Sequence, residues 1–246
     1  MTDSINFLSS RRALEKLVQY QNELENPNES IRDILLTVAG ILNEQFTIHN
    51  IEAIVVGGTS VELYSDGQYT TRDLDIFSDE EAKIVEIMKA LGFEKVDRHF
   101  VHSSLAIYVE FPSGEFKGDK NHVIEVFYNG YTIKMIGMED IIIDRLTNAV
   151  NTGAPADLEW ARKMMTAQFD KVNWRFFTKE QLSKKQYGLT KDHIERILYF
   201  IEETNITIQE FKEGNTSNNL QKSLLDLQVL RGDISVKEAK KHREEI

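Results

Sequence analysis

The chain is organised around residues 51–77, IEAIVVGGTSVELYSDGQYTTRDLDIF. Residues 54–56 form a short β-branched run, which is typical of a strand that is buried on both faces. Gly57 and Gly58 follow, and their lack of a Cβ atom lets the backbone turn sharply and approach a ligand. Residues 59–64 suit the first turns of a helix. The N–H groups and positive dipole end of such a helix attract an anion such as phosphate.

Two hydroxyl side chains, those of Thr59 and Ser60, stand at the start of this expected helix. Hydroxyl oxygens at that place can cap a helix or contact the same anion that the backbone attracts. We therefore include both residues, with Gly57 and Gly58, in a candidate site for phosphate.

A second strand is expected over residues 71–77, where acidic and apolar side chains alternate. Asp73 and Asp75 leave one face of this strand, and Leu74 and Ile76 leave the other. Two carboxylates on one face repel each other unless a cation lies between them. Mg²⁺ is the expected cation, with Mn²⁺ as the alternative, because it takes oxygen ligands and shares them with substrate phosphates. The other interpretation is a tight glycine turn followed by two solvated strand acids.

The order of these motifs resembles the polymerase-beta-like nucleotidyltransferase superfamily. Its signature is a strand ending in a hydrophobic residue and Gly-Gly, a short helix, and then Asp-hydrophobic-Asp-hydrophobic on the next strand. The segments VVGGTSVELY, TRDLDI, LGFE, RHFVH, YVEFPSG and MEDIIIDRL are further similar, in this order, to bacterial stand-alone nucleotidyltransferases grouped with abortive-infection and toxin-antitoxin enzymes. The resemblance covers roughly residues 35–165. It departs in one place, because 14 residues, 59–72, separate Gly58 from Asp73.

The resemblance implies a metal-dependent nucleotidyltransferase that moves a nucleoside monophosphate from an NTP to an acceptor hydroxyl, as a toxin or phage-defence enzyme. The turn from Gly57 to Ser60 would hold the triphosphate, and Asp73 and Asp75 would hold the metal. The acceptor would be tRNA or a protein, and a cognate antitoxin would be the partner. The alternative is a non-catalytic nucleotide-binding or partner-binding protein, antitoxin-like or regulatory, on the same fold.

A third carboxylate is implied on a neighbouring strand, where it would complete the metal site or help to deprotonate the acceptor. We assign it to Glu110, in a strand expected over residues 105–111. Glu125 in VIEVF is the competing choice and ranks second, because the context of Glu110, VEFPSG, matches the relatives better. The other interpretation of Glu110 is a strand glutamate that points into solvent.

Basic and imidazole side chains are further candidate ligands. Arg145 either binds nucleotide phosphate at the mouth of the site or pairs with Asp157 on the next helix. His99 and His102 are three residues apart, which places them on opposite faces of a strand and argues against a shared metal. Hydrogen-bonded structural roles are expected for both histidines, and the alternative is a contact with phosphate or base near the catalytic strand.

The pattern of elements predicts an α+β fold (α/β core), with a small mixed β-sheet of the nucleotidyltransferase type flanked by helices and followed by a C-terminal helical region. The domains are expected over residues 1–30, 31–137 and 138–246, with a polar linker at 213–219. Helices are expected over residues 4–25, 31–46 (capped by Ser30), 79–91 (with a Ser78–Glu81 capping box), 139–150, from Pro155, 178–187, 189–204, 217–231 and after Ser235. Strands are expected over residues 94–102 and 105–111, with a hairpin of 123–127 and 132–136 about Asn129-Gly130.

Composition limits the environment and the partners. There is no cysteine, residues 1–20 lack an apolar signal-peptide core, and no apolar run approaches the ~18 residues of a membrane span. A cytoplasmic protein without a membrane partner is therefore expected. The net charge is −11, yet residues 170–246 hold 14 Lys and Arg against 13 Asp and Glu. A polynucleotide acceptor would be held by this part of the chain. The basic residues concerned are Lys184, Lys185, Lys191, Lys240, Lys241 and Arg243.

Overall fold

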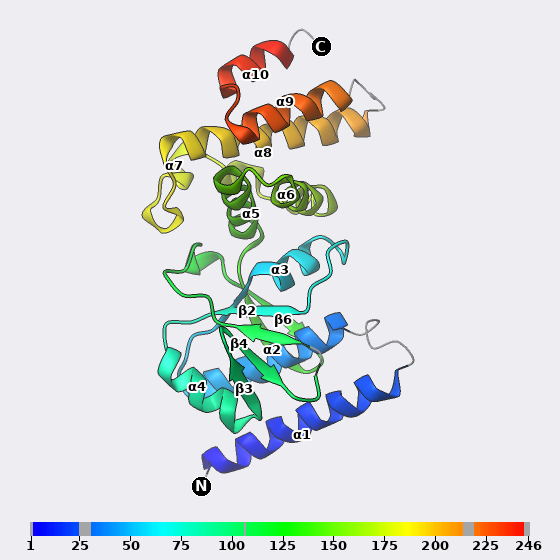
Figure 1. The fold of residues 1–246 in the computed structure, drawn as a ribbon, viewed down its shortest axis with the longest axis vertical. Coiled ribbons are helices and arrows are strands. Elements are labelled where there is room, and N and C mark those ends of the chain that lie inside the picture. Colours follow the sequence, from blue (N-terminus) through cyan, green and yellow to red (C-terminus); the bar gives the residue numbers. More distant parts are fainter. Residues whose placement is uncertain (1, 25–30, 106, 214–218, 244–246) are drawn as a thin grey trace. The chain divides into compact units, whose positions relative to one another are not determined.

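The computed structural model describes residues 2–24, 31–105, 107–213 and 219–243 (Figure 1). The chain divides into two compact units. The first consists of Met1–Leu63, Tyr69–Phe116 and Lys120–Gly137, and the second of Tyr64–Gln68, Lys117–Asp119 and Met138–Ile246. We call them the sheet unit and the helical unit.

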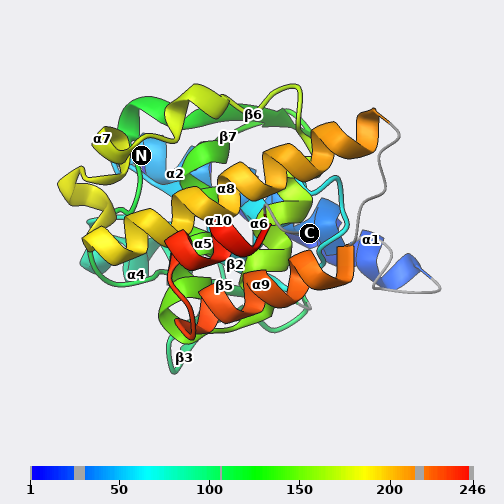
Figure 2. The same ribbon diagram turned by 90° about the horizontal axis from the view of Figure 1, so that it is seen from above.

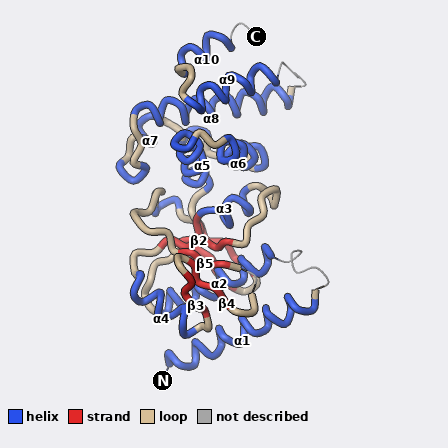
Figure 3. The backbone as a smooth tube through the Cα atoms, viewed as in Figure 1, coloured by secondary structure: helices blue, strands red, loops and turns tan. Residues whose placement is uncertain are grey.

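All strands of the described residues belong to one mixed sheet in the sheet unit (Figure 3). Its order is β3-β4-β5-β2-β1-β7-β6. The pairs β1–β7 and β2–β5 are parallel and the other neighbours are antiparallel. The strands are β1 (Ile54–Val56), β2 (Asp73–Phe77), β3 (Phe93–Val96), β4 (His99–His102), β5 (Tyr108–Glu110), β6 (Ile124–Tyr128) and β7 (Tyr131–Met135).

Four helices accompany the sheet: α1 (Thr2–Glu23), α2 (Ile31–Ile48), α3 (Gly57–Tyr64) and α4 (Glu81–Ala90). Helix α2 packs against β7, β2 and β6, and its apolar residues recur every three or four positions. Ile34, Leu35 and Ile41 are fully buried there. Helix α1 packs on α2, where Gln45 donates a hydrogen bond of 2.8 Å to Ser10. Helix α2 thereby covers one side of the sheet with its apolar face.

The helical unit is built from α5 (Met138–Thr152), α6 (Pro155–Ala167), α7 (Lys179–Leu182), α8 (Lys191–Lys212), α9 (Asn219–Arg231) and α10 (Val236–Arg243). Helix α5 packs against α6 and α8, and α9 and α10 lie on α8 (Figure 2). The fully buried carboxylate of Asp140 accepts hydrogen bonds from the Asp119 amide and the Tyr187 hydroxyl. None of the described helices is long and apolar enough to cross a membrane.

The expected fold class is confirmed: a mixed sheet flanked by helices is followed by a helical region. The hairpin of β6 and β7 is confirmed as well, with Asn129 and Gly130 at φ +47° and +85° as a two-residue turn requires. Pro155 occupies the first turn of α6 as expected. Ser235 and Glu238 form a reciprocal cap before α10.

Several boundaries differ from the expectation. The strand expected over residues 94–102 is a hairpin of β3 and β4, because Asp97 takes φ +55° and reverses the chain. The strand expected over 105–111 is shortened to β5. Helix α4 begins at Glu81 with Glu80 as its N-cap, so Ser78 is not its capping residue. Ser30 and residues 214–218 of the expected linker lie outside the described residues.

The N-cap of α8 provides a stability test for the helical unit. Thr190 accepts a hydrogen bond of 3.2 Å from the His193 amide, which would otherwise be an unsatisfied donor at the helix start. We expect Thr190→Ala to lower the free energy of unfolding by about 1 kcal/mol, as measured by chemical denaturation. Thr190→Ser keeps the acceptor oxygen and should lose much less. Equal losses in both variants would contradict the capping role.

Candidate functional site

The turn between β1 and α3 is shaped around the carboxylate of Asp75. Gly57 has φ +59°, and a Cβ atom on it would lie 2.0 Å from Asp75 Oδ2. The amide of Gly58 donates a hydrogen bond of 3.2 Å to the same oxygen. Only glycine gives both the left-handed backbone and the free space at position 57. The glycine at position 57 is therefore explained by the position of an acid on the neighbouring strand, whereas a Cβ atom at position 58 would lie 3.2 Å from Thr71 Oγ1.

The hydroxyl groups of Thr59 and Ser60 point into the protein. Both residues are buried, and their hydroxyls donate to the carbonyl oxygens of Asp73 (3.1 Å) and Val55 (3.3 Å). They tie the start of α3 to β2 and β1 rather than capping the helix. Their expected contact with phosphate stays a prediction, and in this arrangement it would have to come from backbone amides at the turn.

Strand β2 presents its acids as the alternation predicts. Leu74 and Ile76 are buried, Asp75 is partly buried, and Asp73 is exposed. Asp73 and Asp75 therefore leave the same face of the sheet, and the buried pair faces the apolar core. The Thr71 hydroxyl accepts a hydrogen bond of 3.0 Å from the Asp73 amide, which fixes the start of the strand.

Glu110 lies on the strand next to these acids. In the parallel pair of β2 and β5 it stands directly opposite Asp75, so both side chains leave the same face. Glu125 lies on the edge strand β6, opposite Lys134, and two strands separate β6 from β2. Of the two glutamates considered, Glu110 is the one that the fold brings beside Asp75.

Two basic side chains contact Glu110 from the β3–β4 hairpin. Arg98 Nε and His99 Nε2 each lie 3.4 Å from Glu110 Oε2. His99 faces Glu110 across the antiparallel pair of β4 and β5, whereas Arg98 sits in the turn with 73% of its side chain exposed. An ion pair this exposed contributes at most about 1 kcal/mol, so another cation can replace Arg98 at little cost.

Sequence reasoning missed these partners of Glu110. The signal was present in Arg98-His99, but it becomes readable only once Asp97 is recognised as a turn residue, because that turn sets the register of β4. His102 has a separate place: its ring packs edge-on against Phe93, and burial lowers its pKa below the usual value. The two histidines thus have different surroundings.

The carboxylates near the glycine turn can be compared with the ligands that a metal ion requires. Within the described ranges, no group of three or more His, Cys, Asp or Glu side chains is arranged as a preformed metal site. Mg²⁺ is commonly held by one or two carboxylates together with substrate phosphates rather than by an all-protein cage. Asp73 and Asp75 supply two carboxylates on one face, and this oxygen-only pair fits such an ion.

Arg145 belongs to the helical unit, where it is held by two acids. Its guanidinium contacts Asp144 at 2.8 Å and Asp157 at 3.2 Å. The ion pair with Asp157 is thus one of the two expected arrangements. Its contact with nucleotide phosphate stays a prediction.

The sequence and the fold can also be compared with those of known proteins. No protein-family model matches the sequence, and no curated protein matches it. The structure is similar to that of an antigenic nucleotidyltransferase-like protein from Paracoccidioides brasiliensis. The two chains are 17% identical, the TM-score is 0.47, and the match covers 74% of this chain and 90% of that chain. The crystal structure of ANT(2'')-Ia in complex with adenylyl-2''-tobramycin is also similar, with 13% identity and a TM-score of 0.40. That match covers 72% of this chain and 98% of the other. The solution structure of the antibiotic-resistance factor ANT(2'')-Ia has 12% identity to this chain and a TM-score of 0.37. The match covers 74% of this chain and 97% of the other.

The contact between Gly57 and Asp75 can be tested by adding the missing Cβ atom. Gly57→Ala should lose about 1–2 kcal/mol of stability for the left-handed backbone and about 1–3 kcal/mol more for the overlap with the carboxylate. The matched control is Gly130→Ala, in the same unit at φ +85°, where no heavy atom lies within 4 Å of the new Cβ. Urea denaturation of both variants measures the difference. Equal losses would show that the turn tolerates a side chain beside Asp75.

Proposed function

We propose that the protein is a metal-dependent nucleotidyltransferase, which transfers a nucleoside monophosphate from an NTP to an acceptor hydroxyl. One observation carries this proposal. A glycine turn at the start of a helix lies against Asp75, while Asp73 and Glu110 leave the same face of the sheet beside it. Carboxylates gathered next to a backbone turn that can approach an anion suit the joint binding of a cation and a triphosphate.

Each residue has a defined part in this proposal. The backbone from Gly57 to Ser60 binds the triphosphate, and Asp73 and Asp75 hold Mg²⁺ or Mn²⁺. Glu110 either completes the metal site when the ion is bound or takes the proton of the acceptor hydroxyl. When bound, the ion neutralises negative charge on the reacting phosphate and on the leaving pyrophosphate. The hydrogen bond from Gly58 keeps Asp75 in place before any ligand arrives.

The transfer step needs one bond to form and one to break. The acceptor oxygen attacks the α-phosphorus, and the bond from that phosphorus to the bridging oxygen breaks with its electron pair leaving on pyrophosphate. The proton of the acceptor hydroxyl goes to a base. Glu110 can take this part once its carboxylate separates from Arg98, and His99 can then stabilise the group through its contact with Oε2.

Substitution of the two strand acids tests the enzyme assignment. We expect Asp73→Asn and Asp75→Asn each to lower nucleotide transfer by at least about a hundredfold, because they remove charge that the transition state requires. The side-chain carbonyl that Asp75→Asn introduces can still accept the bond from Gly58, so the fold should persist, as circular dichroism would show. Labelled NTPs, Mg²⁺, and cellular RNA or proteins provide the assay. Absence of transfer by the wild-type protein to every acceptor would refute the assignment.

The identity of the third acid can be decided with two glutamates of the same sheet. Glu110→Gln should reduce transfer by about a hundredfold or more if Glu110 is the base. Glu125→Gln, on the edge strand opposite Lys134, should leave the rate unchanged. The rates of both variants, measured in the same assay, separate the candidates. A larger loss in the Glu125 variant would reverse the assignment.

A second candidate function is supported by the contacts of Glu110. Because Arg98 pairs with this carboxylate and His99 lies against the same oxygen, the fold could bind a nucleotide or partner without catalysing transfer. A rise in melting temperature on adding nucleotide, with no transfer in the assay above, would favour this function. Transfer that depends on Asp75 would exclude it.

The acceptor and the biological setting form the finer part of the proposal. We place tRNA or a protein as the acceptor and a cognate antitoxin as the partner of a toxin or phage-defence enzyme. Among the basic residues named for holding a polynucleotide, Lys184, Lys240 and Arg243 form ion pairs within the helical unit. Lys185, Lys191 and Lys241 are exposed. Mass spectrometry of RNA and protein from cells that make the wild type or the Asp75→Asn variant would identify the modified acceptor.

A further inference from the structure

A cavity of about 210 Å³ lies in the helical unit, lined by residues of α6, α8, α9 and α10. Its lining contains three basic side chains, each from a different helix, and a set of hydroxyl groups. The residues that matter here are Arg162, Lys222 and Arg243, with Thr166, Thr204 and Thr207. Every one of them belongs to the helical unit, whereas the glycine turn and its acids belong to the sheet unit.

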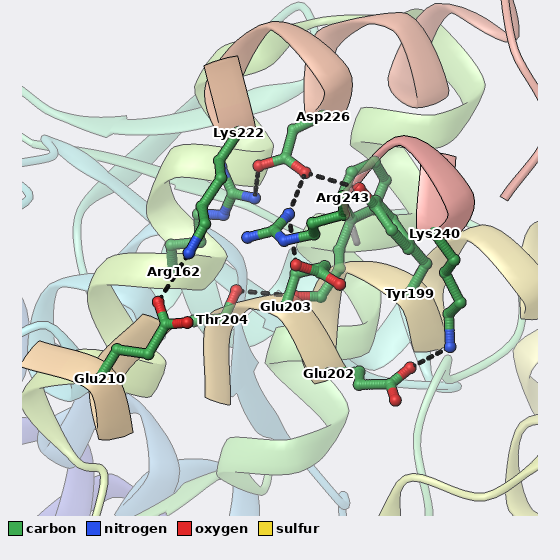
Figure 4. Close-up of polar contacts among 11 residues, drawn as sticks. Arg162, Tyr199, Glu202, Glu203, Thr204, Glu210, Lys222, Asp226, Lys240 and Arg243 are labelled. Atoms are coloured by element: carbon green, nitrogen blue, oxygen red, sulfur yellow. Dashed lines mark hydrogen bonds and ion pairs between the residues drawn. The ribbon is translucent and has the colours of Figure 1, made fainter. Parts of the chain in front are cut away.

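The basic side chains are held in place by carboxylates (Figure 4). Asp226 is 2.6 Å from Arg162 Nη2 and 3.6 Å from Arg243 Nη1, and it accepts a hydrogen bond from Tyr199. Figure 4 shows both guanidinium groups turned toward this carboxylate. The arrangement fixes the two arginines from different helices, α6 and α10, around one acid.

The other two acids of the cluster stand behind the cavity lining. Glu203 pairs with Arg243, and Glu210 pairs with Lys222 at 2.7 Å. Neither glutamate lines the cavity, whereas both of their basic partners do. The wall of the cavity therefore carries three positive groups and one negative group, Asp226.

Two of the basic side chains that line the cavity are largely buried. Only 11% of the Arg243 side chain and 12% of the Lys222 side chain are exposed. Burial also raises the pKa of Glu203, against the opposing effect of Arg243, so its negative charge is costly to maintain. Arg243 Nη1 and Glu203 Oε2 are ion-pair partners, and Nη1 also lies 3.6 Å from Asp226 Oδ1. Of these two carboxylates, only Asp226 lines the cavity beside Arg243.

An ion-pair network that served stability alone would be expected to close up. Protein interiors are packed to a density that leaves few voids larger than a water molecule, and buried charges are favourable only when well surrounded. Here the charged groups border a space that is many times larger than one water needs. The hydroxyls of Thr166 and Thr204 donate to carbonyls of their own helices, so their oxygens remain as acceptors at the wall.

We propose that this cavity binds a small phosphate monoester that also carries hydroxyl groups. The guanidinium groups of Arg162 and Arg243 and the ammonium of Lys222 hold the phosphate, since charge-assisted N–H donors of this kind are its preferred partners. The threonine oxygens accept hydrogen bonds from the hydroxyls of the rest of the ligand. The site goes beyond the transferase function, because it shares no residue with the acids or the glycine turn.

Isothermal titration calorimetry on the full chain, at constant ionic strength, tests the proposal with ribose 5-phosphate, inorganic phosphate and ribose as probes. We expect ribose 5-phosphate to bind more tightly than inorganic phosphate, and ribose not to bind. Lys222→Gln should weaken binding of ribose 5-phosphate by roughly tenfold, the loss of about one charge-assisted contact. Glu210→Gln should strengthen it, because a carboxylate that competes for Lys222 is removed. Lys212→Gln is the matched control, since Lys212 is also in the helical unit and pairs with Asp170 outside the cavity.

Folding of the variants can be followed separately. The two tryptophans of the chain, Trp160 and Trp174, both lie in the helical unit, so their fluorescence on heating reports the unfolding of that unit. Absence of binding by both phosphate compounds to the wild type would overturn the proposal. Equal affinity in wild type and a folded Lys222→Gln variant would overturn it too, since phosphate would then be bound elsewhere, as at the glycine turn. Equal affinity for ribose 5-phosphate and inorganic phosphate would refute the role of the hydroxyl groups.

Discussion

The position of one carboxylate, that of Asp75, governs the arrangement of the sheet unit. Its oxygen fills the space where a side chain at position 57 would lie, and it accepts the amide hydrogen of Gly58. This contact joins the end of β1 to the middle of β2 and sets where α3 begins. Because β2 pairs in parallel with β5, the same placement carries Glu110 to the side of Asp75. The contact that requires glycine at position 57 thus also fixes the strand that places Asp75 beside Glu110.

Features that depend on near neighbours in the chain could be predicted from the sequence. The face shared by Asp73 and Asp75 follows from the period of a strand, and the turn at Asn129-Gly130 follows from residues that accept positive φ. The hairpin at Asp97 could not be read in the same way, because a single aspartate in a left-handed conformation leaves no run of turn residues. The contact of His99 with Glu110 depends on that turn and on strand register, so it was also hidden.

The helical unit shows the same limit at longer range. Its helices could be placed from spacing and from start signals such as Pro155 and Ser235. The sequence did not indicate that Arg162 and Arg243 would meet at Asp226. These residues lie on three different helices, α6, α10 and α9, each of which packs against α8. Charges far apart in the chain look like ordinary surface residues until the core has brought them together.

The parallel pairing of β1 with β7 constrains how the sheet can be assembled. Val55 pairs with Met135, so the central strand lacks one neighbour until the chain has been synthesised through the β6–β7 hairpin. Closing so long a loop costs entropy and is slow compared with forming local hairpins. Until β7 is made, the edge of the apolar strand β1 is unpaired and can pair with other chains. Helix α2 precedes β1 in the chain and packs against β2, so it can cover part of the apolar face of the sheet while the ribosome completes the remaining strands.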